Sequence, residues 1–167
     1  MKLLTGLWHK HDTSQNRIQG LCRPKWYRGG LTTSGRWTQQ GYPVVYFSES
    51  LSLAAWEKLM QFESVKHIPN DYVSLTVEVP ESSIQIITKE ELDKNIKGWD
   101  SFPHHSDTRI IGTNFLKSKK YLLLRIPSAV IQDEFNYIMN PLHPLRVEAK
   151  IIETKPFIFD ERLKTKK

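Results

Sequence analysis

One apolar run limits what this chain can fold into more than any other feature. The segment YLLLRIP, Tyr121 to Pro127, places leucine and isoleucine side chains at nearly successive positions instead of alternate ones. Such a run is typical of a strand that is buried on both faces of a sheet. Pro127 ends the run, because proline cannot donate a hydrogen bond to a neighbouring strand. We therefore predict a central strand over Tyr121–Ile126, with other elements covering both faces of its sheet.

A second strand shows the opposite pattern. In YVSLTVEVP, residues 72–80, valine and leucine alternate with serine, threonine and glutamate, which predicts a half-buried strand that ends at Pro80. Shorter runs of β-branched and aromatic residues predict strands at PVVYF, residues 43–47, and SIQII, residues 83–87. The segment AKIIETKPFIFD, residues 149–160, supplies a last pair of strands. The chain is thus expected to contain more strand than helix.

Two segments predict helices. SESLSLAAWEKLMQFESV, residues 48–65, is rich in helix-forming residues, and either Ser48 or Ser50 can cap its first turn. DTRIIGTNFLKS, residues 107–118, mixes isoleucine and phenylalanine with polar residues and has Asp107 at its start as a cap.

The remaining segments predict loops. The first 30 residues are polar and rich in Lys, Arg and Gly, and FNYIMNPLHP, residues 135–144, resembles a turn. Both short and long connections separate the strands, which favours a mixed or antiparallel sheet over a doubly wound parallel one. The length of 167 residues fits one domain with a real core. We expect a single α+β domain over residues 1–167, with a mixed or antiparallel sheet core and flanking helices.

The chain is basic, with a net charge of +6 and a short basic tail over residues 162–167. This balance suits an anionic ligand: nucleic acid, a dinucleotide or an acidic protein. No apolar run approaches the roughly 18 residues that a membrane helix needs. The apolar part of the N-terminus is too short for a secretory signal, and the lone Cys22 gives no disulfide framework. We therefore expect a cytoplasmic protein without a membrane partner.

One short stretch, SGRWTQQGYPVVYFSESLSLAAWEKL, holds an arginine, a tyrosine and a glutamate at junctions between loop, strand and helix. Arg36 precedes the strand, Tyr46 lies near its end, and Glu57 lies in the helix that follows. Ser128 comes directly after the apolar strand. Each residue also has an ordinary structural explanation: a solvated loop arginine, a core aromatic, a surface glutamate and a turn serine. Spacing alone does not decide between the two interpretations.

Other chemistry has weaker support. His104 and His105 suggest a metal site, but no third ligand has convincing spacing, so we expect no metal. The chain lacks the GxxxxGK and GxGxxG patterns with which common nucleotide-binding folds hold phosphates. A conventional nucleotide-binding fold is therefore excluded.

Several motifs follow one another in a recognisable order. They are SGRWTQQGYPVVYFSESLSLAAWEKL, DYVSLTVEVP, GWDSFP, TRIIGTNFL, LLLRIPSAVIQDEFNYIMNPLHP and KPFIFDERL. In this order the chain resembles the RES-domain family, the toxins of RES–Xre toxin–antitoxin pairs, named for an arginine, a glutamate and a serine. The resemblance runs over residues 34–163 and implies an ADP-ribosyltransferase-like fold that uses NAD+ as a substrate, with no separate cofactor.

The resemblance also implies roles for individual residues. Arg36 matches the family arginine and would pair with the pyrophosphate, and Tyr46 would stack on nicotinamide. Glu57 matches the family glutamate and would stabilise the positive charge that builds on the ribose as the bond to nicotinamide breaks. Ser128 would add a hydrogen bond to the ribose or the amide. Asn136 falls in a further family motif and is expected to help bind NAD+.

The chain departs from the family pattern in two places. The family has GGRWN, where this chain has Ser34 in place of one glycine and Thr38 in place of the asparagine. The family also carries an arginine soon after its start, where this chain has His9. Arg17 and Arg28 are the residues that could replace it.

The resemblance predicts a toxin that cleaves the nicotinamide–ribose bond of NAD+ by phosphorolysis or hydrolysis. Its partner would be a cognate Xre-type antitoxin, through which alone it would contact nucleic acid. Three alternatives stay open: an ADP-ribosyltransferase that modifies a protein, a basic RNA-binding or RNA-cleaving toxin, and a catalytically inactive interaction module.

Overall fold

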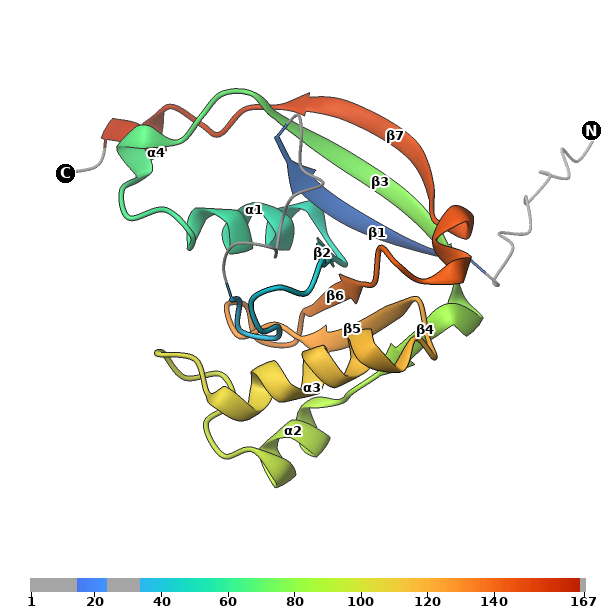
Figure 1. The fold of residues 1–167 in the computed structure, drawn as a ribbon. Coiled ribbons are helices and arrows are strands. Elements are labelled where there is room, and N and C mark those ends of the chain that lie inside the picture. Colours follow the sequence, from blue (N-terminus) through green and yellow to red (C-terminus); the bar gives the residue numbers. More distant parts are fainter. Residues whose placement is uncertain (1–14, 24–33, 166–167) are drawn as a thin grey trace, which may run out of the picture.

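The computed structural model describes residues 15–23 and 34–165. In this part of the chain, seven strands form one sheet in the order β4-β5-β6-β2-β1-β3-β7 (Figure 1). The strands are β1 (Gln15–Cys22), β2 (Val45–Ser48), β3 (Tyr72–Pro80), β4 (Ile84–Ile86), β5 (Leu123–Pro127), β6 (Phe135–Met139) and β7 (Lys150–Phe157). Of the described pairs, β4 and β5 run parallel and the others are antiparallel. The predicted α+β class with a mixed sheet is therefore confirmed.

β5 is the strand that the apolar run predicts. Leu123, Leu124 and Ile126 are fully buried, so the prediction of burial on both faces is confirmed. β5 pairs with β4 on one side and with β6 on the other, so it is an interior strand of the sheet as predicted, although its neighbour β4 is an edge strand. Burial on both faces reflects the layers that cover a strand, and not the rank of the strand in its sheet.

Helices cover one face of the β4–β5–β6 part of the sheet. α2 (Lys89–Asn95) and α3 (Ser106–Ser118) pack over the side chains of Leu124, Ile126 and Ile138. Figure 1 shows both helices below these strands. The helix predicted over residues 107–118 is confirmed as α3, whereas α2 was not expected.

Strands from both parts of the sheet share a second core. Leu123 and Tyr137 belong to the same buried cluster as Ile18, Val77 and Val79 from β1 and β3. Figure 1 shows these two parts of the sheet turned toward each other. This explains how a strand next to the sheet edge is covered on both faces.

α1 (Leu51–Leu59) follows β2 directly and confirms the presence of the other predicted helix, but it ends at Leu59 and not at Val65 as expected. It begins at Ser50, whose side chain accepts a hydrogen bond from the backbone N–H of Leu53 at 3.0 Å. Ala54 belongs to a third buried cluster together with Leu21 of β1. Because the connection between β2 and α1 is short, the end of β2 determines the position of α1 and of the residues along it.

The structure corrects several expectations. β1 occupies a segment predicted as loop, and β6 occupies the segment predicted as a turn. Both form because they pair with strands on each side, β1 with β2 and β3, and β6 with β2 and β5. The last strand segment is one strand, β7, and not a pair. The cap of α3 is His105 and not Asp107.

Parts of two predicted features cannot be compared with the structure. α4 (Arg162–Thr165) begins the basic tail, and residues 166–167 lie outside the described residues. The predicted loop over residues 1–14 and 24–30 also lies outside them. Among the described helices, none has the length and apolar character to cross a membrane.

Candidate active site

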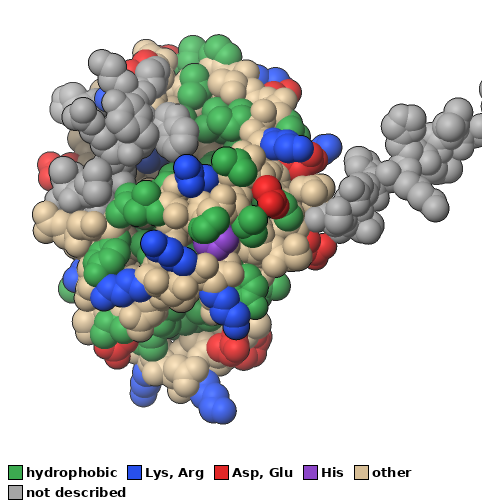
Figure 2. All heavy atoms as spheres, turned by 45° about the vertical axis from the view of Figure 1, so that its right-hand side comes forward, with side chains coloured by type: hydrophobic (Ala, Val, Ile, Leu, Met, Phe, Trp, Pro, Cys, Tyr) green, Lys and Arg blue, Asp and Glu red, His purple; other side chains and the backbone are tan. Residues whose placement is uncertain are grey.

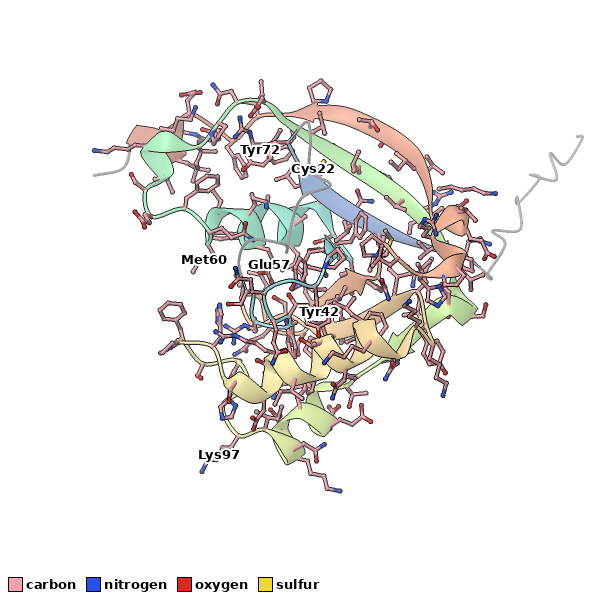
Figure 3. The ribbon with its side chains drawn as sticks, viewed as in Figure 1. Cys22, Tyr42, Glu57, Met60, Tyr72 and Lys97 are labelled. Atoms are coloured by element: carbon pink, nitrogen blue, oxygen red, sulfur yellow. The ribbon has the colours of Figure 1, made fainter. Side chains whose placement is uncertain are left out.

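Polar side chains meet between α1 and the ends of three strands. Glu57 projects from α1 and is half-buried (Figure 3). Its Oε1 accepts a hydrogen bond from Oγ of Ser128 at 2.9 Å and another from Nδ2 of Asn136. Ser128 and Asn136, which follow Glu57 by 71 and 79 positions, thus meet it at a single carboxylate oxygen, and Glu57 is not a freely solvated surface glutamate.

The register of the sheet brings these residues together. Asn136 of β6 lies opposite Ser48 of β2 and opposite Ile126 of β5, so the end of β5 leads directly to Ser128. Oγ of Ser48 donates a hydrogen bond to Oδ1 of Asn136 at 2.7 Å. This bond fixes the amide with its oxygen toward Ser48 and its nitrogen toward Glu57.

Backbone groups that follow Ser128 in the chain also fix its side chain. Its Oγ accepts hydrogen bonds from the backbone N–H groups of Val130 at 3.0 Å and Ile131 at 3.1 Å. Because a hydroxyl has one proton and two acceptor lone pairs, its proton is left to point at Glu57. The side chain is buried. Ser128 and Asn136 therefore fix the carboxylate in one position.

Tyr46 precedes Ser48 by two positions in β2 and so points to the same face of the sheet. Although 43% of the residue is exposed, its hydroxyl is enclosed beside Gly35 and shares a hydrogen bond of 2.9 Å with Oγ1 of Thr38. Burial of this hydroxyl raises the pKa of Tyr46 to about 12, although the hydrogen bond to Thr38 acts in the opposite direction. The phenol is therefore neutral at ordinary pH, with its ring open to a ligand. Thr38 is one of the two departures from the motif GGRWN.

Arg36 precedes β2 and reaches the loop before α3. Its Nη1 donates hydrogen bonds to the backbone oxygens of Trp99 at 2.8 Å and Ser101 at 3.0 Å. Partial burial lowers the pKa of Arg36, and the negative charges of Glu57 and Asp100 oppose this shift. Arg36 thus lies within electrostatic reach of Glu57 without a direct contact. Its use in holding a loop is a role that the sequence did not reveal.

The start of α3 holds the segment that carries Arg36. Oγ1 of Thr108 lies 2.7 Å from the backbone oxygen of Arg36 and 2.7 Å from that of His105, so the two oxygens share its single proton. Nε of Arg109 donates a hydrogen bond to the backbone oxygen of Gly35 at 3.2 Å. Both donors lie in the first turns of α3, so the position of Arg36 depends on the position of this helix.

Close packing completes the contact between α3 and this segment. The backbone N–H of Gln39 donates a hydrogen bond to Oγ1 of Thr113 at 3.1 Å. A Cβ atom on Gly112 would lie 1.9 Å from the backbone oxygen of Trp37, so only glycine fits there. The motif TRIIGT therefore positions the motif GRWT, a relation that the sequence showed only as an order of motifs.

The two neighbouring histidines have different surroundings. His105 caps α3 by accepting a hydrogen bond from the backbone N–H of Asp107 at 3.3 Å. Nδ1 of His104 is buried and has no hydrogen-bond partner among the described residues. Burial lowers the pKa of His104, and the charges of Arg36 and Arg109 lower it further. Within the described ranges, no group of three or more His, Cys, Asp or Glu side chains could hold a metal ion.

The residues considered for the early family arginine are only partly described. Arg17 lies in β1 and pairs with Glu78 of β3, with its Nε 3.4 Å from Oε1. His9 and Arg28 lie outside the described residues. Which residue replaces the early arginine stays a prediction.

A cavity of about 270 Å³ lies on the other face of β2. Val45 and Phe47 line it, and along the strand they alternate with Tyr46 and Ser48. Arg146 is the charged residue in a lining that is otherwise apolar over the described residues. We refer to this hollow as the apolar cavity, and to Arg36, Tyr46, Glu57, Ser128 and Asn136 together as the polar site.

Comparisons with known proteins identify relatives. The RES domain family matches residues 7–160 of the chain. The chain is 37% identical over 136 residues to "Toxin Res" of Pseudomonas putida, which covers 81% of this chain and 89% of that protein. It is 29% identical over 138 residues to the "Prs ADP-ribosylating toxin" of a Sphingobium species, and this alignment covers 81% of this chain and 83% of that protein.

One solved structure has a similar fold. A chain of the crystal structure of the M. tuberculosis MbcT–MbcA toxin–antitoxin complex matches with a TM-score of 0.64. The match covers 86% of this chain and 85% of that chain, at 9% sequence identity. At this identity the likeness establishes the fold alone.

Proposed function

The chain belongs to the RES domain family, and we propose that it is the toxin of a toxin–antitoxin system and cleaves the nicotinamide–ribose bond of NAD+. The name of the Pseudomonas putida relative and the complex that contains the structural neighbour support the role as a toxin. One observation carries the chemical part of the proposal. The carboxylate of Glu57 is half-buried and held in place by Ser128 and Asn136.

The chemistry of the bond explains why such a carboxylate is useful. Breaking the nicotinamide–ribose bond builds positive charge on the ribose, as in other glycosidic cleavages. A carboxylate that is already fixed stabilises this charge without reorganising during the reaction. Both hydrogen bonds to Glu57 reach Oε1, so within the described residues Oε2 remains available for the ribose.

The rest of the polar site matches the charges of NAD+. The dinucleotide is negative at its pyrophosphate and positive at its nicotinamide ring. Arg36 would face the pyrophosphate with the nitrogens that the loop does not use, while Glu57 would face the ribose beside the nicotinamide. The exposed ring of Tyr46 would stack on the nicotinamide. Nicotinamide leaves as a neutral molecule, so positioning and electrostatics suffice and no covalent nucleophile is required.

The acceptor of the ADP-ribosyl group separates two versions of the reaction. Transfer to phosphate or water consumes NAD+ outright by phosphorolysis or hydrolysis. Transfer to a protein side chain makes an ADP-ribosyltransferase, which is the second proposal because the Sphingobium relative is named an ADP-ribosylating toxin.

The decisive experiment incubates the purified protein with NAD+, with and without phosphate, and separates the products. We expect NAD+ to disappear and nicotinamide to be released. Expression without an antitoxin should stop growth and lower cellular NAD+. Arrested growth with undiminished NAD+ would contradict depletion and favour the transferase.

An RNA-directed toxin is the rival from another class. On the face shown in Figure 2, basic side chains are interspersed with hydrophobic and acidic ones, unlike the continuous basic stripe of many nucleic-acid interfaces. Parallel incubation with RNA tests this rival. RNA cleavage in a preparation that leaves NAD+ intact would overturn the proposed function.

Arg36 offers a test of substrate binding. Arg36→Lys keeps the positive charge but loses the planar fork, so NAD+ affinity should fall, and Arg36→Ala should lower it further. Titration with NAD+ measures both changes. Equal affinity in all three proteins would place Arg36 outside the binding site.

The partner that we propose is a cognate antitoxin of the Xre type, which inhibits by covering the polar site. An acidic segment of the partner could offer a carboxylate to Arg36, and the net charge of +6 would speed its approach. Titrating the purified complex with NAD+ tests this mode of inhibition. Unchanged NAD+ affinity in the complex would rule out a blocked site.

A further inference from the structure

We propose that Arg109 and His104, together with Arg36, form a binding site for a phosphoryl anion at the start of α3. This inference rests on the proposed function, because the anion expected there is the pyrophosphate of the dinucleotide. Inorganic phosphate has the same chemistry and is a second source of such a group. The site adds Arg109 and His104 to the residues that the family resemblance implies.

Backbone contacts tie the three side chains into one unit. Nε of Arg109 donates its hydrogen bond to the backbone oxygen of Gly35, the residue before Arg36. Nη1 of Arg36 donates to the backbone oxygen of Ser101, in the loop that continues to His104. The charges of Arg36 and Arg109 both act on the imidazole of His104, so groups from three segments lie near one another before any ligand binds.

Arg109 has hydrogen-bond donors to spare. In the described part of the chain, Nε is the nitrogen of this side chain that has a partner, and no described carboxylate forms an ion pair with it. Nη1 and Nη2 remain available in a planar fork. Such a fork matches two oxygens of a phosphoryl group better than a point charge does.

His104 supplies an independent observation. Its Nδ1 is buried without a partner among the described residues, and a buried polar nitrogen of this kind is costly to leave unpaired. The ring of Phe102 packs edge-on against the imidazole, with centroids 5.6 Å apart. The positive charges of Arg36 and Arg109 both lower the pKa of His104, after the larger effect of burial. A phosphoryl oxygen would give Nδ1 a partner and offset the two positive charges.

The neighbouring charges leave this end of the site positive. Glu57 and Asp100 act on Arg36, so part of its charge is balanced. Asp107, in the first turn of α3, lies 3.6 Å from Nδ1 of His105 and does not pair with Arg109. The positive charge of Arg109 is therefore the one that a ligand anion would balance.

The first experiment titrates the purified protein with inorganic pyrophosphate. Arg109→Gln should weaken pyrophosphate binding about 10-fold or more, since a hydrogen-bonded charge is lost, and His104→Phe about threefold. The control, Arg146→Gln, removes the same charge at the apolar cavity and should leave the affinity unchanged. The proposal would be overturned if the wild-type protein did not bind pyrophosphate. It would also be overturned if Arg109→Gln and His104→Phe both bound pyrophosphate with the affinity of the wild type.

A second measurement separates binding from a merely structural role of Arg109 toward Gly35. Nicotinamide riboside carries the glycosidic bond but no phosphate, so Arg109→Gln should bind it as the wild type does. Arg109→Lys should recover part of the pyrophosphate affinity, because it restores the charge. Equal losses for nicotinamide riboside and NAD+ would show that Arg109 only supports the loop, which refutes the phosphoryl site.

The same variants identify the source of the anion. If Arg109→Gln raises the half-saturating concentration of NAD+, the site binds the dinucleotide. If it raises only that of inorganic phosphate, the site binds free phosphate, and the shared chemistry still holds. Pyrophosphate binding that depends on Arg109 and His104, in a protein that consumes no NAD+, would keep this site and refute the proposed function. If the protein consumes NAD+ but both variants keep the pyrophosphate affinity of the wild type, the proposed function stands and the phosphoryl site is refuted.

Discussion

The two faces of β2 border regions that differ in almost every chemical respect. Tyr46 and Ser48 face the polar site, where Ser48 orients Asn136 toward Glu57. Val45 and Phe47 face the apolar cavity, with its volume of about 270 Å³. A strand of four residues thus separates a cluster of fixed polar groups from a hollow with almost none.

The difference shows that concavity and chemistry need not coincide. The usual first guess for a ligand site is a large apolar hollow with a few converging polar groups, and here the two properties lie on opposite faces of one strand. Buried polar groups are costly unless they are paired, so their convergence at Glu57 is more informative than the shape of the apolar cavity. Substitutions in the polar site should change the reaction, and substitutions at the cavity should change stability at most.

The largest expected effect comes from Glu57→Gln. Glutamine keeps the volume and can still accept hydrogen bonds from Ser128 and Asn136, but it removes the negative charge. We expect NAD+ cleavage to fall by about 100-fold or more, as for other preorganised electrostatic groups. The rate of NAD+ consumption measures this change, and the thermal unfolding midpoint should stay the same. Glu63→Gln removes an exposed charge that follows the end of α1 in the sequence and is the control. If Glu57→Gln kept full activity, the polar site would lose the chemical role that distinguishes it from the apolar cavity on the other face of β2.

The next effect comes from Gly112→Ala. The new Cβ atom would collide with the backbone oxygen of Trp37, so α3 and the segment that carries Arg36 must move apart. We expect a loss of about 2 kcal/mol in the free energy of unfolding, within the range for overpacking. NAD+ affinity should fall as well, because Arg36 moves. Asn114→Ala, at an exposed position of the same helix, should leave NAD+ affinity unchanged and should not lower the free energy of unfolding, because alanine favours helix. A variant that is destabilised but binds NAD+ normally would show that α3 does not position Arg36.

A smaller effect is expected at Tyr46. Tyr46→Ala removes the stacking ring and should weaken NAD+ binding about 10-fold, in line with the value of aromatic stacking on a base. Tyr46→Phe keeps the ring and loses only the hydrogen bond to Thr38, so its affinity should stay within a few-fold of wild type. Because the pKa of Tyr46 is about 12, the wild type should show no titration of this phenol between about pH 6 and 9. Equal losses in the two variants would assign the role to the hydroxyl and not to the ring.

The smallest effect is expected at the apolar cavity. Ala149→Val adds two methyl groups to the cavity wall and narrows it. We expect NAD+ cleavage within about twofold of wild type and a change of less than about 1 kcal/mol in the free energy of unfolding. Kinetic assays and chemical denaturation measure the two quantities. If the variant folds normally but loses activity, the apolar cavity is part of the functional site, and the two faces of β2 do not differ in function as we expect.

Much of the fold was predictable because its pattern is local. The continuous apolar run identified β5, the alternation of residues 72–80 identified β3, and the helix-forming segment after Ser50 identified α1. The order of the motifs also indicated the family. For β3 and β5, the side chains that produce the pattern are also those that are buried, so the sequence alone is sufficient.

Other features were decided only by tertiary structure. β6 reads as a turn because FNYIM mixes polar and aromatic residues without a clear period, yet it becomes a strand because β2 and β5 pair with its backbone on both sides. His105 rather than Asp107 caps α3 because the helix begins two positions earlier than a cap at Asp107 would place it.

The sequence by itself determined which residues could do chemistry, and the tertiary structure decided which of them meet. Glu57 lies in a helix that is distant in the chain from Ser128 and Asn136, and only the pairing of β2, β5 and β6 brings the three side chains to one carboxylate oxygen. The contact of Gly112 with Trp37 was equally invisible, because close approach between backbones leaves no mark in the periodicity of side chains. Local patterns report burial along one element, whereas a site depends on the distances between elements.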